Sequence, residues 1–170
     1  MAASEERLRR WFESVDVNKT GNINAAHLKE ALAAGNLHFS DSVVQQMIRM
    51  HDADRNGIMS FEEFVVLNRF LSNVQNAYAI MERGSGFLTL SDVYEALLKA
   101  GYTLDQPAFY TVCQSFDRTK QGRFRLDDFI SLCIFLQSAK NLFTTFDTTK
   151  QGRVTLDFNQ FVYCAANCRI

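Results

Sequence analysis

Residues 52–63 read DADRNGIMSFEE, and the rest of the chain repeats this pattern with variations. Oxygen-bearing side chains stand at the first, third, fifth, ninth and twelfth positions, and glycine stands at the sixth. A twelve-residue loop with this spacing can wrap one calcium ion, using a backbone carbonyl at the seventh position and both carboxylate oxygens of the twelfth. Glycine suits the sixth position because the backbone turns sharply there with positive φ. The pattern therefore predicts these ligands: Asp52, Asp54, Asn56, Ile58, Ser60 and Glu63.

The pattern occurs five times, each time as a glycine followed two residues later by an apolar residue. The glycines are Gly21, Gly57, Gly86, Gly122 and Gly152. Apolar residues at helical spacing flank every copy, as in a chain of repeated supersecondary units. We therefore predict an all-α protein of five helix–loop–helix units, with short β-bridges between the apolar residues of neighbouring loops. The five loops are expected at residues 16–27, 52–63, 81–92, 117–128 and 147–158.

The gaps between the five glycines alternate between long and short. Each long gap contains helix-breaking residues: Gly35-Asn36 in the first, and Gly101 with Pro107 in the second. The short gaps contain no breaker, so one continuous helix is expected over residues 61–81 and another over residues 126–146. Helices shared in this way tie units 2 and 3, and units 4 and 5, together. We expect residues 1–170 to form a single domain.

Loop 1 offers oxygen ligands at its early positions but ends differently from loop 2. Its candidate ligands are Asp16, Asn18, Thr20 and Asn22. The twelfth position is His27, whose imidazole offers one nitrogen where calcium prefers two hard oxygens. Weak or absent calcium binding is therefore expected, and a transition-metal role for His27 has no clustered partner residue to support it.

Loops 3, 4 and 5 have lost ligands that calcium needs. Loop 3 has Met81 at its first position and Arg83 at its third, and loop 5 ends in Phe158, which cannot coordinate an ion. Loop 4 ends in Asp128, one methylene shorter than glutamate. Four basic residues of loop 4 oppose a bound cation: Arg118, Lys120, Arg123 and Arg125. We expect these three loops to be structural.

Composition narrows the functional classes. Hydrophobic residues make up 47% of the chain, which argues against a disordered protein, and the net charge of −1 with no basic stripe argues against nucleic-acid binding. The four cysteines form no C-x-x-C pair, so free thiols in a reduced, cytoplasmic setting are expected. The three histidines lie in or beside loops without a nucleophile or base near them in sequence, so no enzyme is predicted.

No membrane-spanning or lipid-anchored segment is expected from the sequence. The start of the chain is polar and charged, and Ala2 stands where N-myristoylation would need glycine. The helical pattern over residues 61–81 is amphipathic. Any membrane association is therefore expected to be peripheral.

Five units with shared helices resemble the penta-EF-hand family over nearly the whole chain. The resemblance is most specific in the glycine spacing, in Phe116-Asp117-Arg118 followed by Gly122 and residues 127–130, and in the loss of ligands in the fifth loop. The family implies dimerisation through the fifth EF-hand, which would also lack a partner inside the chain if hands 1 and 2, and hands 3 and 4, pair. The expected interface consists of Val154, Phe158, Phe161, Val162 and Tyr163. Whether the dimer is a homodimer or a heterodimer stays open.

The functional hypothesis at this point is a calcium-binding adaptor without enzymatic activity. Calcium at loop 2 would draw Glu63 inward and shift the helix that begins at Phe61, which could expose an apolar groove for a partner protein or peptide. Because four of the five loops lack ligands that calcium needs, two alternatives to this function stay open. One is a largely calcium-independent dimeric scaffold, and the other is the regulatory subunit of a partner such as a protease.

Overall fold

The computed structural model describes residues 4–52 and 54–168 of the chain. Ala2, on which the lipid-anchor prediction rests, and Ala53, the second residue of loop 2, lie outside the described residues. The elements in chain order are α1 (Glu5–Val15), β1 (Asn22–Ile23), α2 (Ala25–Ala34), α3 (Asp41–His51), β2 (Met59–Ser60), α4 (Phe61–Glu82), α5 (Leu90–Ala100), α6 (Gln106–Phe116), α7 (Leu126–Phe146) and α8 (Phe158–Asn167).

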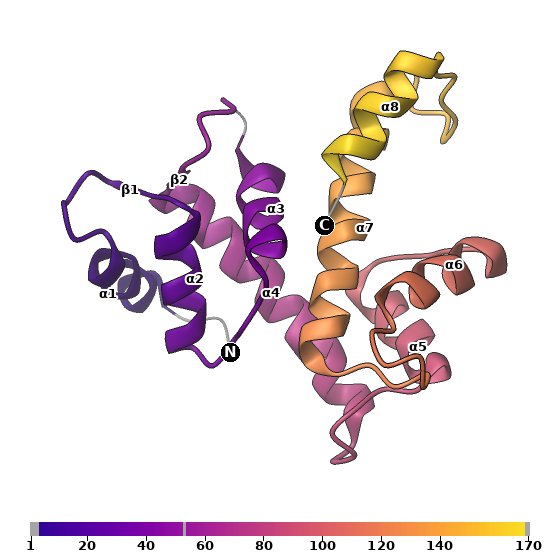
Figure 1. Cartoon of the computed structure of the whole chain (residues 1–170), viewed down its shortest axis with the longest axis horizontal. Coiled ribbons are helices and arrows are strands. Elements are labelled where there is room, and N and C mark those ends of the chain that lie inside the picture. Colours follow the sequence, from indigo (N-terminus) through magenta and orange to yellow (C-terminus); the bar gives the residue numbers. More distant parts are fainter. Residues whose placement is uncertain (1–3, 53, 169–170) are drawn as a thin grey trace.

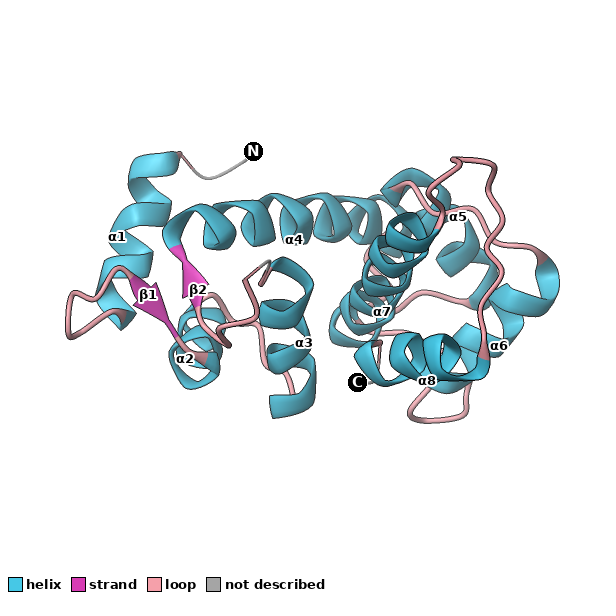
Figure 2. Cartoon of the chain, turned by 90° about the horizontal axis from the view of Figure 1, so that it is seen from above, coloured by secondary structure: helices cyan, strands magenta, loops and turns pink. Residues whose placement is uncertain are grey.

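These elements confirm the predicted fold of helix–loop–helix units with shared helices. Helix α4 leaves loop 2 and enters loop 3, and α7 leaves loop 4 and enters loop 5. Figure 1 shows α4 running from the N-terminal hands to the other half of the molecule, where α5, α6 and α7 lie. Seen from above, α8 lies beside α7 at the C-terminal end of the chain (Figure 2).

The helix ends follow from the residues that flank them. Ser40 caps α3 by accepting a hydrogen bond from the Val43 N–H. Gly101 ends α5 in the left-handed conformation, with φ of 97°. Pro107 lies in the first turn of α6, where its missing N–H costs little. The breakers predicted in the second long gap therefore separate α5 from α6.

Short β contacts pair the loops as predicted. In loops 1 and 2, Ile23 pairs with Met59 in an antiparallel two-stranded sheet. In loops 3 and 4, Leu88 and Phe124 form an isolated bridge, with N–H···O distances of 2.8 and 2.9 Å. Val154, the equivalent residue of loop 5, forms no bridge in the described part of the chain. Hand 5 is therefore left without a loop partner.

Aromatic side chains fill the core on both sides of α4. The indole N–H of Trp11 donates to the Ala31 carbonyl at 2.9 Å, and its ring meets Phe64 edge-on. Toward the other end of α4, the Tyr78 and Phe129 rings lie 5.9 Å apart. Among the described helices, α7 alone has the length and hydropathy of a membrane span, but its first half is buried in this core. That burial accounts for the apolar composition of the first half, since 39% of the apolar stretch is buried.

Candidate metal centre

Loops 1, 2, 4 and 5 share one backbone scaffold. In each, the residue at the fourth position adopts positive φ, between 52° and 57°, and the glycine at the sixth position turns the chain. The aspartate at the first position accepts a hydrogen bond from that glycine's N–H at 2.7–2.8 Å. This carboxylate–amide bond closes the loop whether or not the other positions suit an ion. The four aspartates are Asp16, Asp52, Asp117 and Asp147.

In loop 2 the carboxylates and the Asn56 amide oxygen accept hydrogen bonds from within the loop, and in the described residues they are not gathered around one centre. The Asp52 carboxylate accepts from the N–H groups of Asn56 and Gly57 at 3.0 and 2.7 Å. Asp54 accepts from the Asn56 side-chain amide at 2.9 Å, and the Asn56 Oδ1 accepts from the Ile58 N–H at 3.0 Å. All of these acceptors are oxygens, the atoms that calcium selects.

Glu63, the last predicted ligand, lies in the first turn of α4. Its Oε2 accepts from the Ser60 N–H at 2.9 Å, and the Ser60 hydroxyl accepts from the Glu63 N–H at 3.3 Å. This capping box fixes the carboxylate over the loop. Within the described residues, no Lys or Arg forms an ion pair with Asp52, Asp54 or Glu63. The donor set of loop 2 therefore fits calcium.

The pKa of Asp52 favours the charged form that a metal ligand needs. Partial burial acts to raise this pKa, but a hydrogen bond from the Gly57 N–H, with lesser contributions from the Asp54 side chain and the Asn56 N–H, outweighs it and holds the pKa below its usual value. Asp52 is therefore an anion at neutral pH.

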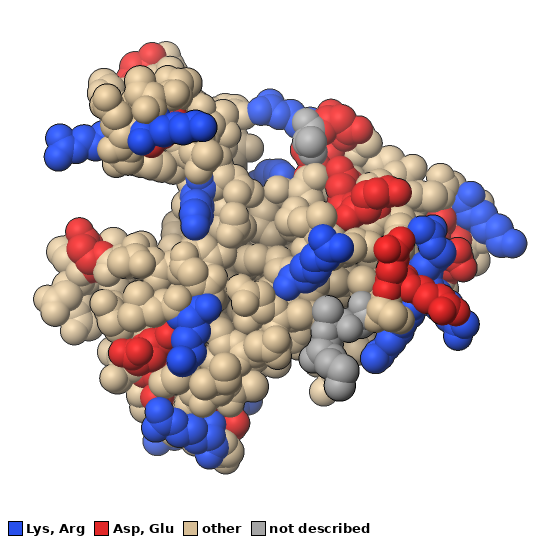
Figure 3. Space-filling view, turned by 180° about the vertical axis from the view of Figure 1, so that it is seen from behind, with Lys and Arg blue, Asp and Glu red and all other residues tan. Residues whose placement is uncertain are grey.

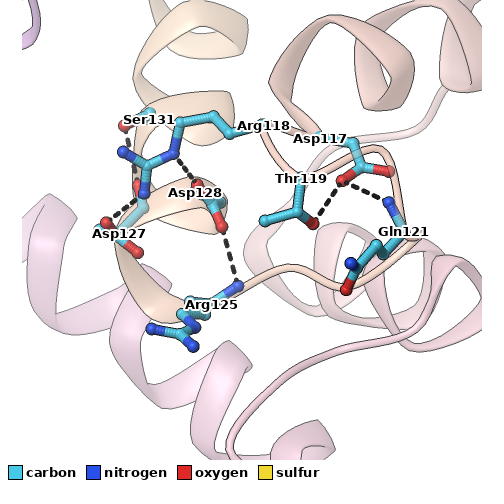
Figure 4. A network of polar contacts seen from close by, with 8 residues as sticks. All are labelled: Asp117, Arg118, Thr119, Gln121, Arg125, Asp127, Asp128 and Ser131. Carbon is cyan, nitrogen blue, oxygen red and sulfur yellow. Dashed lines mark hydrogen bonds and ion pairs between the residues drawn. The ribbon is translucent and has the colours of Figure 1, made fainter.

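Loop 4 is closed by a cation of its own (Figure 4). The Arg118 Nε lies 2.6 Å from Asp128 Oδ1, and its terminal nitrogen pairs with Asp127. The other Asp128 oxygen accepts from the Arg125 N–H at 3.1 Å. Asp128 is only 5% exposed, so the guanidinium balances a carboxylate that is almost wholly buried. Hydrogen bonds to Asp128 and Asp127 raise the pKa of Arg118 above its usual value. The twelfth position of loop 4 is therefore occupied by an internal partner.

In loop 1, His27 takes over the capping role that Glu63 has in loop 2. Its Nδ1 accepts from the Asn24 N–H at 3.4 Å, and the Asn24 side chain accepts from the His27 N–H at 3.0 Å. The nearby Thr20 hydroxyl donates to Asp16 at 3.0 Å. The imidazole Nδ1 thus accepts the same backbone hydrogen bond that Glu63 accepts in loop 2, and weak ion binding at loop 1 stays a prediction that rests on the chemistry of His27.

Loop 3 follows a different course from the prediction, because α4 continues through Met81 to Glu82. Met81 is buried, and the Glu82 carboxylate accepts from the N–H groups of Gly84 (2.9 Å) and Gly86. Glu82 therefore replaces the missing first-position aspartate from one residue later. Glu82 has no role in the loop pattern read from the sequence. Its carboxylate, next to a methionine that cannot bind an ion, could have indicated this role.

The five residues predicted for the dimer interface lie in hand 5, in loop 5 and on α8. Phe158, Phe161 and Val162 are exposed along one face of α8, with Phe158 79% exposed. Val154 is half-buried in loop 5. Tyr163 points instead toward loop 2, where its hydroxyl receives a hydrogen bond from Arg55. No pattern in the sequence indicates this contact, which joins residues 108 positions apart.

An apolar groove runs between α6, α7 and α8, with a volume of about 990 Å³. Its walls are mainly aromatic and aliphatic. Val112, Phe116, Phe135, Phe143, Val154 and Phe161 are among the residues that line it. Phe161 belongs both to this groove and to the exposed face of α8. A molecule bound in the groove would therefore also contact that face.

Comparisons with known proteins agree with this architecture. The family model described as "EF-hand domain pair" matches residues 5–67. Sorcin from Schistosoma japonicum is 32% identical over 95% of this chain and 95% of its own length. Peflin from Xenopus laevis is 31% identical over 89% of this chain and 55% of its own length. The chain thus spans little more than half the length of the peflin that it matches.

The fold is also similar to that of a solved structure. It is described as a homolog of programmed cell death 6 protein from Leishmania major Friedlin, and it superposes with a TM-score of 0.69 at 28% sequence identity. The match covers 98% of this chain and 92% of that one.

Proposed function

The chain belongs to the penta-EF-hand family of calcium-binding proteins, and we propose that it is a calcium-responsive adaptor without enzymatic activity whose main ion site is loop 2. One observation carries this assignment. Among the described residues, none of the three carboxylates Asp52, Asp54 and Glu63 of loop 2 is paired with a cation, whereas the twelfth residue of loop 4 is bonded to Arg118. Three carboxylates suggest affinity on the order of micromolar.

The residues of loop 2 link the ion to the middle of the molecule. Calcium would supply a positive charge that draws carboxylate oxygens toward one centre. Glu63 lies in the first turn of α4, so its movement is passed to a helix that ends in hand 3 at Glu82. The two-stranded contact between Ile23 and Met59 ties hand 1 to the same loop.

Two surfaces support the adaptor role. The exposed face of α8, with Phe158, Phe161 and Val162, suits a dimer through hand 5, because a second copy or a relative could cover it. The groove between α6, α7 and α8 suits an extended partner segment with apolar side chains. We expect this protein to act in the cytoplasm, where four free thiols stay reduced.

Calorimetric titration with calcium tests the assignment of the ion site. The wild-type chain should bind one calcium ion per chain, and both Asp52→Ala and Glu63→Gln should abolish that binding. The matched control is Asp147→Ala, which removes the first-position aspartate of loop 5 and should leave the titration unchanged. Two or more sites of similar affinity would contradict the assignment.

A second candidate, the calcium-independent scaffold, is favoured by the Arg118 pair that closes loop 4 from within. The same property would suit a regulatory subunit that stays bound to a partner such as a protease. A dye that reports exposed apolar surface separates the candidates. An adaptor that switches gives a calcium-dependent signal, and a scaffold gives the same signal with and without calcium.

A further inference from the structure

Loop 2 contacts hand 5 through a residue that is not an ion ligand. Arg55, at the fourth position of the loop, donates a hydrogen bond to the hydroxyl of Tyr163 on α8. The centre of its guanidinium also lies 5.7 Å from the Tyr163 ring centroid. Asp54 and Asn56, two of the predicted ligands, flank Arg55 directly, so the backbone that positions the ligands also positions this contact.

A second contact joins hand 2 to the other end of α8. The Gln46 side chain on α3 donates to the Asn167 carbonyl, in the last turn of α8, at 2.9 Å and to the Ser138 hydroxyl on α7 at 2.8 Å. Ser138 in turn donates to the Ile134 carbonyl at 2.8 Å. Gln46 is 1% exposed, so both of its amide protons are used in a buried contact. Hand 2 thus supplies a cap for the C-terminus of α8.

Besides these contacts, α8 meets α7 through the edge-on pair of the Tyr163 and Phe146 rings and packs loosely. None of the residues from Phe158 to Asn167 is buried. A cleft of about 880 Å³ with a mixed polar and apolar lining separates α3 and loop 2 from α7 and α8, and Arg55, Tyr163, Gln46 and Asn167 lie on its walls. Figure 3 shows the molecule from behind, with the α8 end set apart at the upper left and acidic side chains gathered over the N-terminal hands. In such a weakly packed helix, single hydrogen bonds decide local stability.

We propose that the Arg55–Tyr163 and Gln46–Asn167 contacts form a latch through which calcium at loop 2 controls the order of α8. This inference rests on the proposed function, because it requires calcium to bind loop 2. It adds that hand 5, which lacks its own ion ligand at position twelve, is regulated by the ion site of hand 2.

The direction follows from the geometry of the loop. Asp54 is bonded to the Asn56 amide, and Asn56 Oδ1 to the Ile58 N–H. Ion binding needs these oxygens to turn toward a common centre, which rotates the peptide groups on both sides of Arg55. The Tyr163 hydroxyl then loses its donor, and α8 is released. The face of α8 that carries Phe158 and Phe161 becomes more mobile.

Hydrogen–deuterium exchange of the full chain tests the latch. The protein is studied with EDTA and with saturating calcium, at a concentration where sedimentation shows a single species. Calcium should slow exchange in residues 52–63 and speed exchange in α8 about fivefold, the factor for losing one hydrogen bond of ordinary net strength. In Tyr163→Phe, which keeps the ring, α8 should already exchange about fivefold faster in EDTA, and calcium should add little.

Lys19→Ala is the matched control. Lys19 has the same left-handed conformation at the fourth position of loop 1, with φ of 52°, and should behave as the wild type. If residues 52–63 slow with calcium but α8 does not change, the latch is wrong and the proposed ion site stands. An undiminished calcium effect on α8 in Tyr163→Phe also overturns the latch. If residues 52–63 do not respond to calcium, the proposed function fails and the latch fails with it.

Discussion

Loops 2 and 4 trace the same backbone, yet only loop 2 leaves its twelfth residue available to an ion. Each loop begins with an aspartate bonded to the sixth-position glycine at 2.7 Å. In loop 2 the twelfth residue is Glu63, held only by a backbone N–H. In loop 4 it is Asp128, held by the Arg118 guanidinium at 2.6 Å. The shape of both loops is therefore set by their own hydrogen bonds, and we propose that the group facing position twelve decides whether a loop binds an ion.

Restoring the twelfth-position carboxylate of loop 1 should have the largest effect on calcium binding. His27→Glu gives loop 1 two oxygens in place of one nitrogen, on a backbone that already matches loop 2. We expect calcium affinity at this loop to rise about a hundredfold, because affinity follows ligand number and charge. Calorimetry should then count two ions per chain. A titration that still shows one ion would mean that something besides position twelve disables loop 1.

Removing the internal cation of loop 4 should destabilise the fold. Arg118→Ala leaves the buried Asp128 without its partner, which we expect to cost about 2 kcal/mol, below the range for a fully buried pair because the Arg118 side chain is largely exposed. Urea unfolding in EDTA measures this loss. Arg153→Ala, which removes an exposed arginine from loop 5, is the control and should change stability little. A loss below about 0.5 kcal/mol for Arg118→Ala would show that the ion pair contributes little to the stability of the fold.

Shortening the twelfth residue of loop 2 should separate ion binding from capping. In Glu63→Asp the shorter carboxylate can still accept from the residue-60 N–H, as Asp92 does from Thr89 at 3.0 Å and Asp128 does from Arg125 at 3.1 Å. Unfolding in EDTA should therefore be nearly unchanged. Calcium affinity should fall about tenfold, because aspartate tends to give one oxygen. Equal affinity in both proteins would mean that Glu63 is not a bidentate ligand.

The smallest effect is expected from the loss of folding stability at Asp117 when the pH is lowered. A hydrogen bond from the Gly122 N–H, with lesser ones from Gln121 and Thr119, holds the pKa of Asp117 below its usual value. A lowered pKa stabilises the folded state above the unfolded pKa, and this contribution is lost as pH falls through the folded pKa. Thermal unfolding should therefore show that the wild type is more stable than Asp117→Asn at neutral pH and that this difference in stability disappears between about pH 5 and pH 2. A constant difference across that range would show that the charge of Asp117 does not matter.

Much of the fold was predictable because it depends on local signals. The missing breakers between Phe61 and Met81, and between Leu126 and Phe146, predicted both shared helices, and the apolar residue after each turn predicted the Ile23–Met59 and Leu88–Phe124 contacts. The end of α4 differs by one residue from the expected 81, because Glu82 is helical and its carboxylate accepts from the Gly86 N–H in place of a first-position aspartate.

The site was less predictable because its decisive contacts join residues that are distant in sequence. The ligand spacing of loop 2 could be read directly, but the use of Arg118 as an internal partner of Asp128 depends on where a long side chain folds back. The Arg55–Tyr163 contact spans loop 2 and α8, and no periodic pattern in either segment indicates it. Side-chain pairing of this kind follows from the packing of the hands.

A crystal structure determined with calcium tests the difference between loops 2 and 4 most directly. We predict one ion in loop 2, about 2.3–2.6 Å from oxygens of Asp52, Asp54 and Glu63, with the Arg118 guanidinium still bonded to Asp128 in loop 4. An ion in loop 4 with Arg118 displaced, or a loop 2 that stays empty at saturating calcium, would contradict the account.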